Sequence, residues 1–593
     1  MSKGPIQVEL AAAAALRRMR IALRIFTKLR LDDRNSLYFW AGLAGLLGAA
    51  VDFGLRQVSN AVLTLLSGDS HAAALAFVSL PAWQRITIPT CGGLLAGLIL
   101  MGVHRFIKVT STDYMEAIAL GDGNVPVRAT LARTGSAVVS FSTGAGIGLE
   151  GPQVQLAALA GSFLGRLRRM APARRRLLVA CGGAAGMAAA NHAPLAGAVF
   201  IAEVILGSLA IETLGPLLVA SIVGVLATSA IEAQAPLFAF TGAGVGSGSD
   251  YLLYPLIGVI AGVAAFTWIR ALSFGRRTMG AIPVPIWARL TIGGLLIGLL
   301  AVIHPEATGN GAYQIRGLLA GSYAWQSIAL ILILRVTCTG ITVGSGAVGG
   351  ILTPTLFAGS AIGYLAALLA SQLSPMGPVP TAPCVLAGMG AFLAASAGGT
   401  VTAVLLVFEL TLRYDIILPV AVAVIAAHAT ARAFGRMNLY GESLRSGPHT
   451  AFDLPLADIT VADLMRPTRH ALGLAAPFRD IAAAFLTGGS SQLWIITTNG
   501  KLVGRIMLAD VEPFLREEEL ASTIIAGDIL HEMPPVLTPT TSLPAALEVF
   551  TKYKGEALPV TEPTTSRLLG SLGRADLFMI LAELSRREQA SPN

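Results

Sequence analysis

The chain of 593 residues is too apolar to be a soluble protein of its length. Hydrophobic residues make up 54% of it and charged residues only 13%, whereas charged residues account for about 25% of an average soluble protein. The basic residues behind its net charge of +8 cluster beside apolar segments, at 17–30 and 166–176, so the charge does not indicate nucleic-acid binding. We expect a multi-pass protein of the lipid bilayer, and the positive-inside rule places both clusters and the N-terminus in the cytoplasm.

Cysteine, histidine and acidic residues form no pattern typical of catalysis or metal binding. The four cysteines, Cys91, Cys181, Cys338 and Cys384, stand singly in apolar segments. The absence of a CxxC pair and of a Cys/His cluster in the sequence argues against a metal site and a disulfide framework. No Ser/His/Asp constellation lies at a plausible membrane interface, so we do not expect an enzyme.

The apolar segments differ in length along the chain. Residues 1–37 have the pattern of a basic amphipathic helix and connector. The apolar segments that follow lie at 38–64, 87–107, 128–143, 153–165, 176–191, 194–206, 214–232, 252–272, 288–303, 355–373, 383–397, 400–412 and 416–435. Several are shorter than the ~20 residues of a perpendicular span. Because broken helices are tolerated at membrane depth only where they are buried or line a cavity, these short segments predict a site at their ends.

Two glycine-rich breaks interrupt the apolar pattern. The first, GAGIGLEGP at 144–152, holds an ionisable residue, Glu150, directly before a helix-forming run, and the second, GSGAVGGILTP at 344–354, precedes another. A helix N-terminus presents free N–H groups and a partial positive charge, so it attracts anions. Paired breaks are typical of a midplane site in transporters built from inverted repeats. We interpret the pair as an anion site that the carboxylate of Glu150 itself occupies.

After residue 445 the composition becomes that of a soluble protein. An α/β pattern then occurs twice, most clearly in GRIMLAD at 504–510 and GSLGRAD at 570–576. In order, the expected parts are a linker at 446–455, a first unit at 456–525, a second unit at 526–585 and a tail at 586–593.

The membrane part, 38–445, resembles the CLC family of chloride channels and chloride/proton exchangers, in the form of its B-type bacterial branch. The motifs that carry the resemblance are GIGLEGP at 146–152, HAPLAG at 192–197, GGILTP at 349–354 and Tyr440. The tail resembles the CBS domain pair of many family members. The resemblance implies an all-α membrane fold with inverted repeats and broken helices, followed by an α/β CBS pair. It also implies a homodimer in the bacterial inner membrane, with both termini cytoplasmic and one chloride path per subunit.

The resemblance assigns Glu150 as the gating glutamate, whose carboxylate occupies the outer anion site and leaves when it is protonated or displaced. Backbone amides would hold the central anion, together with a tyrosine hydroxyl. Amide and hydroxyl donors bind an anion while still letting it leave. The anion-binding residues implied are Gly148, Gly151, Ile351, Leu352 and Tyr440.

Two departures from the family pattern affect the anion site. The GSGIP segment, whose serine coordinates chloride, is not present as such. The equivalent position along the chain falls in STDYM at 111–115, so Thr112 is the residue expected to supply the chloride-binding hydroxyl. The segment GDGNVP at 121–126 is the second candidate for the equivalent of GSGIP. Leu149 replaces the usual arginine and removes a charge beside the gate.

A third departure concerns protons. Val204 stands where exchangers carry the proton-relay glutamate, and Glu203 falls one position earlier. Adjacent helical residues lie on different faces, so Glu203 does not simply substitute, and it is equally well explained as a helix-end or intersubunit carboxylate. We prefer channel-like chloride conduction, with a proton-coupled antiporter as the alternative. A fluoride-selective or other anion carrier is a further alternative, and a CBS-regulated cation transporter is a remote one.

The CBS pair of the family often binds adenine nucleotides. Asp510 and Asp576 occupy the positions of its nucleotide-contacting aspartates, but Met507 and Gly573 replace the accompanying hydroxyl residues. We therefore expect a dimerisation and gating platform rather than a nucleotide site, and no other cofactor or metal.

Overall fold

The computed structural model describes most of the membrane part and most of the C-terminal units. The described residues are 33–67, 77, 80–106, 113–119, 121–231, 236–240, 251–373, 379–434, 439, 460–467, 471–488, 492–511, 514, 524–531, 533–553, 555–574 and 576–577. The expected N-terminal amphipathic helix lies almost entirely outside them. The first described helix, α2, begins at Asp33, inside the range that the sequence pattern assigned to that segment.

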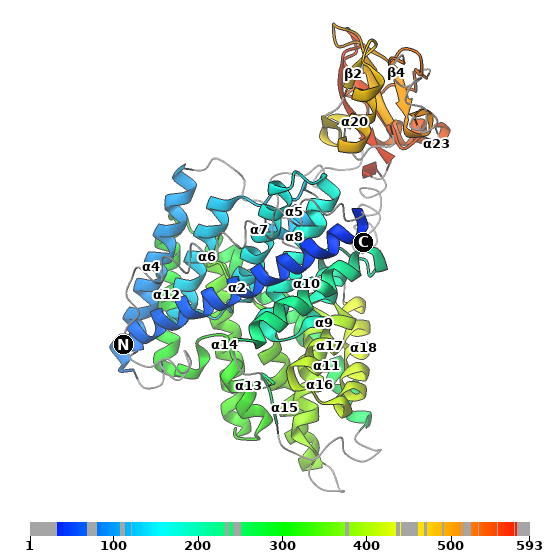
Figure 1. Ribbon diagram of the computed structural model, residues 1–593. Helices are drawn as coiled ribbons and strands as arrows, with labels where there is room; N and C mark the ends of the chain where they lie inside the picture. Colours follow the sequence, from blue (N-terminus) through cyan, green and yellow to red (C-terminus); the bar gives the residue numbers. More distant parts are fainter. Residues whose placement is uncertain are drawn as a thin grey trace, which may run out of the picture.

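Within the described residues, eight helical segments are long and apolar enough to cross a membrane. They are α2 (Asp33–Ser67), α4 (Ala82–Phe106), α10 (Ile211–Ser229), α11 (Leu253–Gly280), α12 (Ile286–Ile303), α14 (Trp325–Ser345), α15 (Leu352–Leu373) and α18 (Ile417–Ala433), the last preceded by the 3-10 turn η4 (Tyr414–Ile416). Figure 1 shows them packed into one helical body. The predicted multi-pass helical fold is confirmed.

Shorter helices lie between the long ones. They are α5 (Tyr114–Ala119), α6 (Val127–Ser142), α7 (Glu150–Leu167), α8 (Pro172–Asn191), α9 (Pro194–Phe200) with its π-helical extension η1 (Ile201–Ile205), α13 (Ala312–Leu319), α16 (Thr381–Ala397) and α17 (Thr400–Thr411), with the 3-10 turn η3 (Pro305–Ala307). The apolar pattern predicted broken helices in the region of α6–α9 and apolar segments in the regions of α16 and α17. It named no helix for α5, α13 or α14.

The two helices after each glycine-rich break pack in the same way. In the first half α7 packs on α8, and in the second half α15 packs on α16. A Cβ atom at Gly182 of α8 would collide with the carbonyl oxygen of Ala157, and one at Gly363 of α15 would collide with that of Cys384. Small residues thus bring the backbones of both pairs into contact, as is common between membrane helices. The core of the membrane part forms along these contacts, where α8 and α16 are buried over most of their length.

The C-terminal part contains two three-stranded sheets, as the duplicated α/β pattern predicts. The order in the first is β2 (Ala471–Gly473), β3 (Gln492–Ile496) and β4 (Leu502–Met507), and in the second it is β1 (Arg466–Pro467), β6 (Leu568–Gly573) and β5 (Ala557–Thr561). Helices α20 (Phe478–Gly488), α21 (Leu508–Val511) and α23 (Leu543–Lys552) accompany them, after the 3-10 turn η6 (Val461–Asp463).

The first segment of each unit pairs with the sheet of the other unit. Arg466 of β1 pairs antiparallel with Ser571 of β6 in the second sheet. Reciprocally, His531 from the start of the second unit forms an antiparallel bridge with Arg505 of β4 in the first sheet. Each unit therefore adds a paired segment to the sheet of the other.

Candidate anion pathway

The two glycine-rich breaks meet in space. The amide of Gly148 donates to the carbonyl of Gly350 over 2.7 Å, and the amide of Gly350 donates back to the carbonyl of Gly148 over 2.8 Å. A Cβ atom at Gly350 would lie 2.7 Å from the nitrogen of Gly151, closer than real Cβ atoms approach. Glycine is therefore required for this contact, which sets the beginning of α7 against the beginning of α15.

Glu150 is the first residue of α7, and its side chain reaches the other helix. The hydroxyl of Thr353, on the first turn of α15, donates to Oε1 of Glu150. The second oxygen, Oε2, is buried and has no hydrogen-bond partner among the described residues. A Cβ atom at Gly148 would collide with this oxygen, so the missing side chain there makes the room in which the carboxylate lies. A buried carboxylate oxygen without a donor is costly, which favours its departure or protonation.

A cavity of about 350 Å³ opens beside Glu150 and is lined by both breaks. The residues predicted to bind anions that line it are Gly151, Ile351 and Leu352; Gly148 does not line it, and its amide is used by the bridge to Gly350. Three charged side chains that the sequence analysis did not assign also line the cavity: Asp113, Arg133 of α6 and Arg276 of α11. No local pattern marks them, because they come from three separate segments.

Two predicted site residues, Thr112 and Tyr440, lie outside the described residues. Their chain neighbours Asp113 and Leu439 both line the cavity. The roles expected for the threonine and tyrosine hydroxyls therefore stay predictions.

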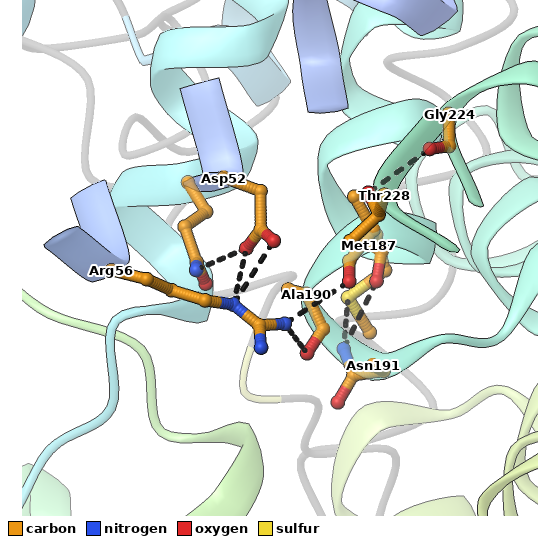
Figure 2. A network of polar contacts seen from close by, with 9 residues as sticks. Asp52, Arg56, Met187, Ala190, Asn191, Gly224 and Thr228 are labelled. Atoms are coloured by element: carbon orange, nitrogen blue, oxygen red, sulfur yellow. Dashed lines mark hydrogen bonds and ion pairs between the residues drawn. The ribbon is translucent and has the colours of Figure 1, made fainter. Parts of the chain in front are cut away.

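A polar network fixes the first turn of α7. Gln153 donates to the buried carboxylate of Asp52 over 2.6 Å, and the guanidinium of Arg56, one turn later on α2, forms an ion pair of 3.0 Å with the same carboxylate. Figure 2 shows Arg56 between Asp52 and Ala190. Its Nη2 donates to the carbonyls of Ala189 and Ala190 at the end of α8, over 3.2 and 3.0 Å. An arginine of α2 thus lies at this end of α7, where Leu149 leaves the break itself without the family's usual arginine.

The proton-path candidates lie away from the cavity. The carboxylate of Glu203 accepts hydrogen bonds from the backbone amides of Thr400, Val401 and Thr402, over 2.8, 3.1 and 2.8 Å, and from the hydroxyls of both threonines. It therefore caps the N-terminus of α17, where a negative charge is favourable. Val204 packs against Gly399, which directly precedes that helix.

Glu409 makes the reciprocal contact. It lies near the end of α17 and accepts from the amides of Leu195 and Ala196, over 2.9 and 2.8 Å, at the beginning of α9. Glu203, which follows α9, thus caps α17, and Glu409, near the end of α17, caps α9. The two helices lie side by side (Figure 1). The two glutamates occupy equivalent places in the two halves, which explains Glu203 as a helix-capping carboxylate.

The two aspartates considered for nucleotide binding are engaged with basic residues of the opposite unit. Nε2 of His531 lies 2.9 Å from Oδ2 of Asp510, and Arg466 forms an ion pair with Asp576. Oδ2 of Asp510 also accepts from the amide of Met507 over 2.9 Å. A nucleotide ribose would have to compete with these contacts.

Comparison with known proteins agrees with this geometry. The family model for voltage-gated chloride channels matches residues 92–432, and the CBS domain model matches 526–583. A ClcB-like protein of Ralstonia nicotianae is 39% identical over 423 residues, which are 70% of this chain and 98% of the relative. The voltage-gated ClC-type chloride channel ClcB of Escherichia coli O157:H7 is 33% identical over 408 residues, 67% of this chain and 97% of the relative.

Among solved structures, a slow cyanobacterial Cl⁻/H⁺ antiporter superimposes with a TM-score of 0.62 at 25% identity, over 70% of this chain and 98% of its own. Members of this family are transporters or channels rather than enzymes. The chain, with its paired helix starts and its C-terminal CBS region, belongs to the CLC family of voltage-gated chloride channels and chloride transporters.

Proposed function

We propose that this protein carries chloride through the cavity between α7 and α15, with Glu150 as the gate of the path. The observation that carries the proposal is the position of the Glu150 carboxylate. It lies at the meeting point of two helix N-termini; one oxygen accepts from Thr353, and the other has no partner in the part of the chain that the structure describes. The negatively charged carboxylate of Glu150 therefore occupies the position at which a permeating anion would bind.

Chloride and the carboxylate then compete for the same donors. When Glu150 leaves, the hydroxyl of Thr353 and the first free amides of α15, at Ile351 and Leu352, become available to chloride. Arg133 and Arg276 line the same cavity and make it attractive to anions without binding one tightly at a single point. Neutral donors with distant cations hold an anion weakly enough for it to move on. The hydroxyls of Thr112 and Tyr440 complete the site in this proposal.

Channel-like conduction is the form of transport that we favour. A proton relay needs an ionisable side chain on the route between the gate and the opposite side of the membrane. Val204 has none, and the carboxylate of Glu203 is held by five donors at the beginning of α17. Proton-coupled exchange is the second candidate, because the cyanobacterial antiporter is 25% identical and shares the fold.

Simultaneous measurement of chloride and proton flux separates the two forms. Purified protein in liposomes with an outward chloride gradient should release chloride without moving protons uphill. Uphill proton movement driven by the chloride gradient would contradict channel-like conduction and would establish exchange. Absence of chloride flux would contradict the proposal as a whole.

The assembly and orientation that we propose follow the family. Each subunit of a homodimer carries its own path, and the N-terminus and the CBS pair lie in the cytoplasm of a bacterial cell. The arginine-rich segment at 166–176 supports this orientation through the positive-inside rule. The contacts of Asp510 with His531 and of Asp576 with Arg466 favour a regulatory platform over an adenine nucleotide site in this proposal.

A further inference from the structure

The anion cavity contains a second carboxylate besides Glu150. Asp113 lines the cavity, directly before α5. Neither the motifs nor the family resemblance gives this residue a function. When it is ionised, a carboxylate in an anion path repels the anions that enter. A carboxylate at this position therefore has a consequence for transport.

The backbone at Asp113 is held in place relative to the gate helix. The amide of Tyr114 donates to Oε1 of Gln155 over 3.1 Å, and Nε2 of Gln155 donates to the hydroxyl of Thr130 over 3.3 Å. The carbonyl of Asp113 accepts the amide of Ala117 over 2.9 Å, which closes the first turn of α5. Gln155 belongs to α7, the helix that begins with Glu150. The backbone at Asp113 is therefore fixed relative to the helix that begins with Glu150.

The charges that face Asp113 in the cavity come from three other elements. They are Arg133 of α6, Glu150 of α7 and Arg276 of α11. Helices α8 and α9 contribute the uncharged Met187 and Phe200 to the lining. The carboxylate of Glu203, on η1, is turned to the beginning of α17. Among the described side chains of the lining, two acids accompany two arginines, so neutralising one acid makes the cavity more positive.

Asp113 lies toward one side of the membrane. The loop after α5 is tied to the arginine-rich segment, because Arg175 forms an ion pair of 3.1 Å with Asp122 and donates to its carbonyl over 2.7 Å. That segment follows the far end of α7, opposite to Glu150. The short helix α5 thus lies between the gate and the arginine-rich side, and Asp113 is at the end of α5 that faces the cavity.

We propose that Asp113 is a second titratable control point of the chloride path, on the cytoplasmic side of Glu150. Ionised, it balances one cavity arginine and repels chloride that approaches the central site; protonated, it leaves the cavity positive and admits chloride. The proposal rests on the proposed function of this cavity as a chloride path. Coulomb repulsion between two charges within one cavity is large enough to change chloride flux on the order of tenfold.

The test uses the full-length Glu150→Gln variant, in which the gate no longer titrates. Chloride efflux from proteoliposomes is measured at equal internal and external pH, between about 4.5 and 8. Burial raises the pKa of the Asp113 carboxyl above its ordinary value, so efflux in this variant should still rise roughly tenfold toward acid pH. Adding Asp113→Asn should make efflux independent of pH and equal to the acid rate. Asp113→Ser serves as a second neutral variant if the asparagine protein fails to fold.

Two further double variants sharpen the result. Glu116→Gln removes the same charge from the same short helix but not from the cavity lining, so the pH dependence should remain. Asp113→Glu restores a carboxylate, so the pH dependence should return. A pH-independent Glu150→Gln protein, or a pH dependence that survives both neutral variants, would overturn the assignment of Asp113. Chloride flux in the wild-type protein would leave the proposed function standing in either case.

Discussion

At the scale of single residues, Thr353 decides how firmly Glu150 occupies the path. Its hydroxyl is the donor to the Glu150 carboxylate, and the other carboxylate oxygen has none among the described residues. A hydrogen bond to a charged group contributes about 1.5–3 kcal/mol. Loss of this donor therefore shifts the carboxylate out of the site, and chloride meets a path that is open more of the time.

Thr353→Val is expected to raise chloride efflux at neutral pH about tenfold, since ~1.4 kcal/mol corresponds to that factor. The matched control is Thr355→Val, two residues later on α15, whose hydroxyl bonds to the carbonyl of Ile351 instead. Efflux from proteoliposomes measures both variants. Equal rates in the Thr353 and Thr355 variants would show that the threonine does not hold the gate.

The sequence makes part of this site predictable. Glu150 stands out because an ionisable residue between glycines in an apolar region is unusual, and Ile351 and Leu352 follow from the second glycine break. Thr353, Asp113 and the cavity arginines are not predictable in this way. Their roles depend on the distance between segments far apart in the chain, and threonine or arginine in a helix carries no local signal of what it faces.

At the scale of elements, the two capping glutamates hold short helices that could not persist alone. Helix α9 has only 7 residues and α17 only 12, and isolated helices of such length are marginal. Glu203 accepts hydrogen bonds from the first amides of α17, and Glu409 accepts them from the first amides of α9. An unsatisfied buried amide costs about 1–3 kcal/mol. We therefore regard both glutamates as structural supports of the path.

Glu203→Gln and Glu409→Gln should each lower the melting temperature of the purified protein and leave the pH dependence of chloride efflux unchanged. The physical reason is the loss of a charge-assisted cap, worth about 0.5–2 kcal/mol. Glu212→Gln, at the exposed beginning of α10, is the control for loss of a glutamate in a first helical turn. A melting temperature that stays constant while proton movement changes would instead place Glu203 on a proton route.

Helix α14 shows why one long helix escaped the sequence pattern. Arg335 interrupts its apolar run, and the helix continues directly into the second glycine break. The guanidinium is buried and donates to the carbonyls of Glu306, Thr308 and Gly309, in a loop that precedes the helix. It also lies 4.7 Å from the centre of the Phe357 ring. These tertiary contacts compensate the cost of burying the charge. Because the local sequence does not show them, the apolar pattern around Arg335 does not indicate a long membrane helix.

At the scale of the whole molecule, the two halves of the membrane part are built on the same plan and complete each other. The glycine breaks bond to each other, the helices behind them pack through glycines, and the two glutamates exchange their caps. The paired breaks predicted the first of these relations from the sequence. The exchange of caps and the pairing between the CBS units required the structure, because each joins residues of different repeat units.

Glu150→Ala tests directly whether a removable carboxylate occupies the chloride path. Chloride efflux from proteoliposomes at neutral pH should be faster in this variant than in the wild-type protein, because the site no longer contains a competing negative charge. At acid pH the two rates should converge as the wild-type carboxylate becomes protonated. Equal efflux of wild-type and Glu150→Ala protein at neutral pH would contradict the claim that this glutamate occupies the path.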